Sequence, residues 1–258
     1  DIHLGPDNAL KAWQLLGGKV HQSLPLAWTL ASGDAERDLQ EAHLRLEQKL
    51  HRIFKMKIGA RAPQDDVAHV SQIARGLQGK ATLTVDVNQA WDGSTARRFL
   101  PQMIVAGVTL IEQPVAKWNV EALKTLSAAL GDRASIMADE TVCSPQDAMM
   151  LARAQASQVF SLKVAKHGGL LRTKEVAAVA EAADIAWYGG TMLETSIGSA
   201  ASAQVFSTLG NKHHGCELFG PQLLVDDIVT ELMPIVDFEL QLPDGPGIGV
   251  EIDPVKLE

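Results

Sequence analysis

Cysteine is scarce in this sequence and forms no recognisable pattern. The 258 residues contain two cysteines, Cys143 and Cys216, with no CxxC pair. A disulfide-held scaffold needs more cysteines, so we expect a reduced protein in the cytoplasm. The first residues also show no signal-peptide pattern.

Long apolar runs and an excess of positive charge are missing as well. No apolar run approaches the roughly 20 residues of a membrane-spanning helix. The 23 Lys and Arg residues stand against 31 Asp and Glu, which gives a formal net charge of -8. We therefore expect no nucleic-acid and no membrane partner. An anionic small-molecule substrate would need local lysines or a metal ion.

A glycine-rich phosphate-binding turn is absent after the first predicted strand, where Ser32-Gly33-Asp34 stands instead. This absence disfavours an open doubly wound sheet. The chain does contain short apolar strands that alternate with helices about every 25 residues, which predicts a parallel (β/α) TIM-type barrel with outer helices. We expect strands at 24–30, 52–58, 82–86, 108–112, 135–139, 159–163, 185–189 and, more weakly, 216–218.

Three segments are expected along the chain. Residues 1–20 contain a short helix over 9–16, closed by Gly17-Gly18, with too little sequence before it for an independent unit. Residues 21–235 form the predicted barrel. Residues 236–258 read as an extra strand over 236–242 followed by a Gly/Pro loop.

Polar side chains end one predicted strand after another, at the edge where parallel barrels carry their functional groups. Lys55 and Lys57 lie on one face of the second strand, about 7 Å apart. Their mutual repulsion, together with burial, would lower a lysine pKa unless anions lie nearby. The other strand-end groups are Asp86, Asn88, Glu112, Asp139, Lys163 and Glu194.

Asp86, Glu112 and Asp139 follow three neighbouring strands and would repel one another in the barrel mouth. A hard divalent cation removes this repulsion, and oxygen ligands suit Mg²⁺ or Mn²⁺. Such carboxylates can also cap helices, as Asp139 could before Thr141 and Ser144.

Lys57 and Lys163 belong to strands that lie across a barrel from each other. A substrate bound to the metal would then have an ammonium group on either face. This arrangement suits removal of a proton next to a carboxylate, because the metal stabilises the enediolate.

Strand-end motifs carry a resemblance over nearly the whole chain from about residue 15. Lys55-Met56-Lys57, Asp86-Val87-Asn88, Glu112-Gln113-Pro114, Ala138-Asp139-Glu140 and Leu162 to Gly169 resemble the muconate-lactonizing subgroup of the enolase superfamily. Ala27 to Asp34, Tyr188 to Glu194 and Cys216 to Pro221 look most like its muconate cycloisomerases.

The resemblance implies a reaction that interconverts cis,cis-muconate and muconolactone in the catabolism of aromatic compounds. It implies that Asp86, Glu112 and Asp139 bind Mn²⁺ or Mg²⁺. The implied catalytic residues are Lys57 as acid/base, Lys55 as the residue that tunes its pKa, Lys163 and Glu194. Asn88, Lys163 and Glu194 are the implied substrate-binding residues. The sequence 185–190 has no histidine, which argues against the mandelate-racemase subgroup.

The family also has an amino-terminal capping domain of about a hundred residues, of which residues 1–20 match only the junction with the barrel. A bare apolar surface would then favour a homo-oligomer. Two other functions stay open. One is another subgroup reaction, such as chloromuconate cycloisomerisation, dipeptide epimerisation or o-succinylbenzoate synthesis. The other is a barrel fragment that binds metal and carboxylate without turnover.

Several further residues have open interpretations. Lys166 and His167 read as loop surface, and His213 and His214 as helix caps or solvated side chains. Glu217 either points into the barrel or only holds the eighth strand. Lys55 could be a structural ion-pair partner. Trp28 and Trp187 either pack in the core or form a substrate wall.

Overall fold

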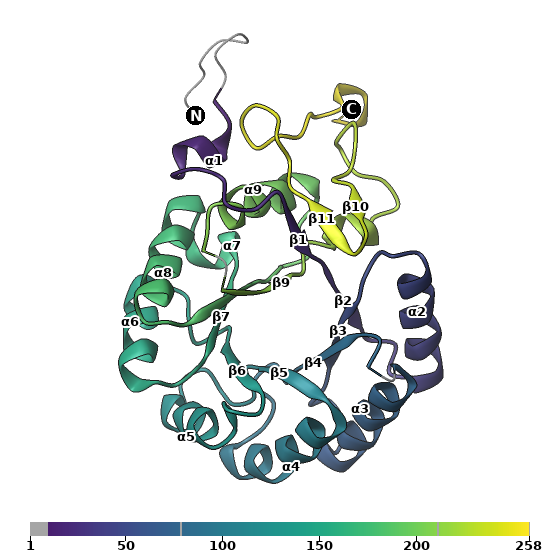
Figure 1. Cartoon of the computed structure of the whole chain (residues 1–258), viewed down its shortest axis with the longest axis vertical. Coiled ribbons are helices and arrows are strands. Elements are labelled where there is room, and N and C mark those ends of the chain that lie inside the picture. Colours follow the sequence, from purple (N-terminus) through teal and green to yellow (C-terminus); the bar gives the residue numbers. More distant parts are fainter. Residues whose placement is uncertain (1–9, 78, 211, 258) are drawn as a thin grey trace.

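A computed structural model describes residues 10–77, 79–210 and 212–257. It shows eight parallel strands in a ring with helices outside (Figure 1). Each strand pairs with the next along the chain, and a parallel bridge between Leu26 and Cys216 joins the two ends of the sheet. This confirms the predicted barrel. The strands are β2 (Ala27–Leu30), β3 (Ile53–Lys57), β4 (Thr82–Asp86), β5 (Val108–Glu112), β6 (Ser135–Ala138), β7 (Val159–Leu162), β8 (Ala186–Gly189) and β9 (His213–Cys216).

The outer helices begin at capping residues that the sequence supplies. Asp34, Asp92, Asn119 and Ser144 each accept hydrogen bonds from backbone N–H groups of the first turn that would otherwise lack partners. No helix in the described ranges is both long and apolar enough to cross a membrane. The outer helices are α2 (Ala35–Glu47), α3 (Pro63–Leu77), α4 (Gly93–Ala106), α5 (Val120–Leu130), α6 (Pro145–Ala154), α8 (Leu170–Ala182) and α9 (Ser196–Phe206), with a short α7 (Val164–His167).

The barrel interior is apolar toward the amino ends of the strands and charged toward their carboxyl ends. A small buried cluster takes six side chains from the first three residues of five strands, two of them from β8: Ala27, Leu110, Met137, Val159, Ala186 and Tyr188. The buried carboxylates Asp86 and Glu112 are the last residues of their strands, whereas Lys55 is the third of the five residues of β3 and reaches Glu112 from there. The apolar layer therefore closes the barrel beneath the charged layer, as expected of a filled barrel core.

The strands predicted near the two ends of the chain are each divided in two in the structure. The segment 24–30 divides into β1 (Ser23–Pro25) and β2, and β1 pairs with a separate antiparallel sheet. The predicted single strand 236–242 is wrong, because β10 (Ile235–Val236) and β11 (Glu239–Gln241) form a hairpin. Asp237 and Phe238 have positive φ angles of 51° and 73°, which reverse the chain between them.

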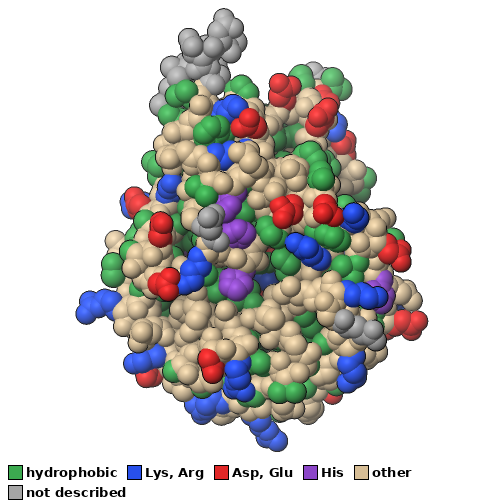
Figure 2. Space-filling view, in the orientation of Figure 1, with side chains coloured by type: hydrophobic (Ala, Val, Ile, Leu, Met, Phe, Trp, Pro, Cys, Tyr) green, Lys and Arg blue, Asp and Glu red, His purple; other side chains and the backbone are tan. Residues whose placement is uncertain are grey.

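The eighth barrel strand, β9, begins at His213 and shares only Cys216 with the predicted 216–218. The expectation that His213 and His214 cap a helix or lie in solvent is wrong, because both belong to this strand. The His213 ring contacts that of His21, with centroids 4.9 Å apart, and histidines gather on the face shown in Figure 2.

The predicted junction helix is shorter than expected. Helix α1 (Ala12–Leu15) is followed by Gly17 and Gly18 with φ near 105° and 103°. Residues 1–9, and with them part of the predicted junction, lie outside the described residues.

We expect the stability of this protein to fall as the pH is lowered through the range set by His51. Burial, with the nearby Arg45 charge, lowers the pKa of His51 to about 3, from an ordinary value of 6.5. Between these values the unfolded chain binds the proton and the folded chain does not. The free energy of unfolding should therefore decrease with falling pH, by at most about 1.4 kcal/mol per pH unit from this group.

Urea unfolding of the protein and of His51→Gln between pH 7 and 4 measures this contribution. The substitution should flatten the pH dependence. Identical pH dependence in the two proteins would refute the assignment.

Candidate active site

A cavity of about 350 Å³ opens at the carboxyl ends of the strands. Charged side chains from four strand ends line it: Lys57, Asp86, Glu112 and Lys163. Trp28 and Phe219 give it an apolar wall, with ring centroids 4.9 Å apart. The Trp28 indole donates to Glu41 (2.9 Å), and the Arg45 guanidinium lies 3.1 Å from its ring centroid. Trp28 thus lines the cavity, and its contacts with Glu41 and Arg45 fix the position of its indole ring.

Lys57 reaches the cavity from the end of β3. Its ammonium donates to Asp86 Oδ2 (2.5 Å) and to Asn88 Oδ1 (3.1 Å). Asp86 pairs in register with Lys57 on one side and with Glu112 on the other. Asn88, at a φ of 44°, also donates its backbone N–H to Asp86 (2.9 Å). These residues therefore form one contact network, and the Lys57 side chain is 43% exposed within it.

Lys55 is buried beneath the cavity. Its ammonium donates to Glu112 and to Glu217 Oε2 (2.6 Å), and lies 4.6 Å from the Tyr188 ring centroid. Burial would lower the pKa of Lys55, but the charges of Glu112 and Glu217 outweigh it and raise that pKa. The expectation of a lowered pKa is therefore wrong for Lys55, and the open interpretation of Glu217 resolves in favour of the barrel interior.

Asp139 follows β6 and is bound by two ammonium groups. Lys163 donates to Oδ2 (2.6 Å) and Lys166 to Oδ1 (2.7 Å). Burial alone would raise the pKa of Asp139, but these two charges hold it well below its usual range. Asp139 does not cap α6, because the Ser144 hydroxyl accepts the N–H of Asp147 there.

Lys166 is a site residue that the sequence reasoning missed. The loop-surface interpretation is wrong, because its side chain is 11% exposed and donates to the backbone carbonyls of Asp139 and Ser161, each at 2.8 Å. Lys163 precedes α7 and Lys166 lies within it, so a short helical turn brings both lysines to the same carboxylate. The spacing of three residues is the signal that could have indicated this. His167 is buried as well.

Glu194 does not line the cavity in this structure. Its carboxylate accepts from the Thr191 hydroxyl (2.5 Å) and the Met192 N–H (3.0 Å), within its own loop between β8 and α9. Thr191 and Leu193 line the cavity instead. The predicted role of Glu194 stays a prediction.

The three acidic strand-end residues fit a divalent cation in the kind of ligand they supply. Burial and the charge of Asp86 raise the pKa of Glu112 to about 8, with a further contribution from Asp139. The described residues contain no group of three acidic, histidine or cysteine side chains already gathered about one point. Lysine ammonium groups hold each carboxylate instead. A hard cation would relieve the repulsion between the carboxylates and accept their oxygen atoms.

Known proteins are similar to this chain in both sequence and architecture. Residues 37–256 match the family model described as enolase C-terminal domain-like. Chloromuconate cycloisomerase of Pseudomonas putida is 48% identical over 243 residues, which cover 94% of this chain and 65% of that protein. Muconate cycloisomerase 1-2 of Acinetobacter lwoffii is 49% identical over 245 residues, which cover 95% of this chain and 63% of that protein.

Solved structures of muconate cycloisomerases are similar to this chain in fold and in sequence. A muconate lactonizing enzyme and the muconate cycloisomerase from Pseudomonas fluorescens each superpose with a TM-score of 0.93 at 46% identity. The matches cover 96% of this chain, and 69% and 68% of those chains. The chain spans slightly less than two thirds of the length of the curated relatives it matches. On the family match, the architecture and these identities, the chain belongs to the enolase C-terminal domain-like family.

Proposed function

We propose that this barrel carries the catalytic groups of a metal-dependent cycloisomerase that interconverts cis,cis-muconate and muconolactone. One observation carries the proposal: Lys57 and Lys163 line the same cavity from β3 and from the end of β7, with Asp86 and Glu112 between them. In the ring order these two strands stand opposite each other. The names of the relatives support the substrate class, and such enzymes serve the catabolism of aromatic compounds.

Each group has a role in this reaction. A divalent cation held by Asp86, Glu112 and Asp139 would supply the positive charge that stabilises an enolate. One substrate carboxylate oxygen bonds to a carbon of the conjugated double bond, and the electron pair moves toward the other carboxylate. Lys57 then delivers its proton to the α-carbon, and takes that proton back in the reverse direction. Lys163 provides positive charge on the opposite face.

The loss of muconate absorbance in the presence of Mn²⁺ tests the proposal. Chloromuconate is the second substrate to measure, because several relatives are named chloromuconate cycloisomerases. Exchange of the α-hydrogen of an amino-acid derivative for deuterium, with none on muconolactone, would favour epimerase chemistry instead. Metal binding without any of these activities would favour a barrel that only binds metal and carboxylate.

The role of an amino-terminal capping domain is a separate part of the proposal. The barrel contributes all the lysines and carboxylates named above, while a cap would exclude water from the cavity. Fusing the amino-terminal part of a relative to this chain should raise turnover. Unchanged turnover in the fusion would count against a need for the cap.

The remaining assignments concern compartment and assembly. Both cysteines are free, Cys143 exposed and Cys216 buried, which supports the cytoplasmic location that we propose. A homo-oligomer is proposed from exposed apolar side chains such as Leu193, Leu223 and Val225. Sedimentation of dilute protein tests the assembly, and a single monomeric species would contradict it.

Gly190 offers a test of the position of Lys163. A Cβ added there would lie 2.6 Å from Ser161 Oγ and 2.7 Å from Lys163 Cε, so Gly190→Ala must displace the lysine. We expect muconate turnover to fall about 100-fold, the order of effect that a misplaced reacting group causes. Gly210→Ala is the control, because its Cβ would make only ordinary contacts. Equal turnover in the two variants would contradict the role of Lys163.

A further inference from the structure

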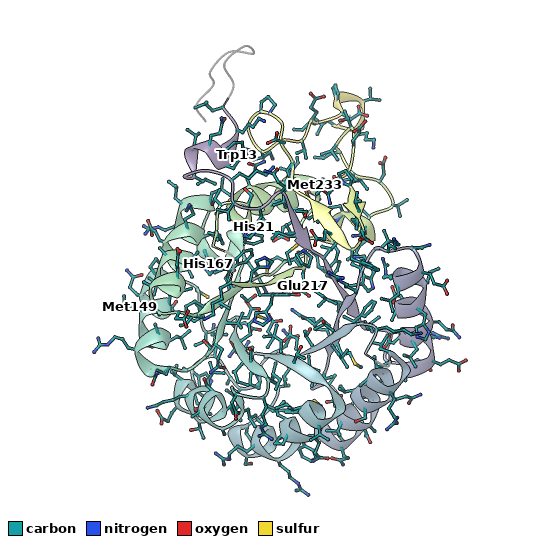
Figure 3. All side chains as sticks on the ribbon, in the orientation of Figure 1. Trp13, His21, Met149, His167, Glu217 and Met233 are labelled. Carbon is teal, nitrogen blue, oxygen red and sulfur yellow. The ribbon has the colours of Figure 1, made fainter. Side chains whose placement is uncertain are left out.

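Glu217 holds a position that the proposed reaction does not explain. It follows β9, and its backbone N–H donates to Gly189 O (2.7 Å), which fixes it beside the end of β8. Its side chain is 6% exposed and lines the candidate cavity, inside the ring of strands (Figure 3). The carboxylate accepts from Lys55 at Oε2 (2.6 Å) and from the Thr29 hydroxyl at Oε1 (3.2 Å).

The ammonium group that Glu217 binds is the same one that holds Glu112. Lys55 is 1% exposed, so water does not compete for its charge. Its ammonium is shared between Glu112 and Glu217, and the Tyr188 ring lies 4.6 Å away. Without the carboxylate of Glu217, Lys55 would have Glu112 as its remaining partner at hydrogen-bonding distance.

We propose that Glu217 is a positioning residue that keeps Lys55 from neutralising Glu112 alone, and thereby leaves Glu112 able to bind a divalent cation. The inference rests on the proposed function, in which Glu112 is a metal ligand. Two physical effects act in the same direction. Loss of the Glu217 charge makes Lys55 a stronger competitor for Glu112, and it also makes the cavity less attractive to cations.

Titration of the metal-free protein with Mn²⁺, followed by electron paramagnetic resonance without substrate, measures the effect apart from turnover. Glu217→Gln should weaken Mn²⁺ binding at least about 10-fold. Glu239→Gln, the same loss of charge on β11 outside the barrel, should bind Mn²⁺ like the unsubstituted protein. Unchanged Mn²⁺ affinity in a folded Glu217→Gln protein would overturn the inference.

A second comparison asks whether Glu217 acts through Lys55. In a Lys55→Met background, Glu217→Gln should change the Mn²⁺ affinity less than about 3-fold, because the competing ammonium is already gone. A full 10-fold loss in that background would overturn the positioning role. If Glu217→Gln does not fold, Thr29→Val provides the test. It removes only the second contact of the carboxylate and should weaken Mn²⁺ binding about 2-fold, and unchanged binding would speak against the inference.

Mn²⁺ binding by the unsubstituted protein and the effect of Glu217 on it are measured separately. If the unsubstituted protein does not bind Mn²⁺, the metal site of the proposed function is overturned, and this inference with it. If the unsubstituted protein binds Mn²⁺ and Glu217→Gln binds it equally well, only the role of Glu217 is overturned.

Discussion

Replacing Lys57 with alanine should lower muconate turnover by about 10³-fold or more while the barrel stays folded. General acid/base groups contribute on this order, and Lys57 is the lysine whose side chain enters the cavity beside Asp86. Its side chain is 43% exposed, so its removal creates no buried cavity. Initial rates with saturating Mn²⁺ and the circular dichroism melting curve measure the two properties together.

Two further variants make the Lys57 experiment specific. Lys80→Ala removes an exposed lysine outside the cavity and should leave turnover unchanged. Lys57→Arg keeps a positive charge beside Asp86, but an arginine does not release its proton at neutral pH. This variant should therefore be as inactive as Lys57→Ala. Turnover by Lys57→Ala close to that of the unsubstituted protein would end the proposed mechanism.

Removal of the divalent cation should abolish turnover and leave the chain folded. Without metal, the lysines already pair with the acidic residues: Lys57 with Asp86, Lys55 with Glu112, and Lys163 with Asp139. These pairs balance the charges of the layer, but without a divalent cation the enolate lacks its main stabilising charge. Dialysis against EDTA followed by addition of Mg²⁺ or Mn²⁺ measures loss and recovery of muconate turnover.

The melting temperature supplies an independent measurement of the same site. Mn²⁺ that binds only the folded protein should raise it in a concentration-dependent way. Glu112→Gln should lose most of this increase, because one carboxylate is gone. Full turnover in EDTA, or an equal Mn²⁺ stabilisation of Glu112→Gln, would show that the three carboxylates are not the metal site.

The local pattern of the chain was sufficient to predict the barrel. Short strands followed by helices require a parallel sheet, and the strand-end positions of Asp86, Glu112 and Lys163 follow from counting along each strand. Their approach to one cavity then follows from closure of the ring, because parallel strands all end on the same side. The carboxyl-terminal hairpin was harder to predict from the sequence. Its turn needs positive φ angles at Asp237 and Phe238, and neither residue is a glycine that would have indicated a turn.

What the sequence by itself determined is which side chains stand at the carboxyl ends of the strands. Only the tertiary structure decided how their charges pair. Lys55 donates to Glu112 and Glu217, which are 57 and 162 residues away in the sequence. Lys166, on the short helix α7, donates to Asp139. The Glu194 carboxylate accepts from Thr191 in its own loop. The physical reason is that strand periodicity is local, whereas a buried charge takes whichever partners the closed barrel brings within hydrogen-bonding distance.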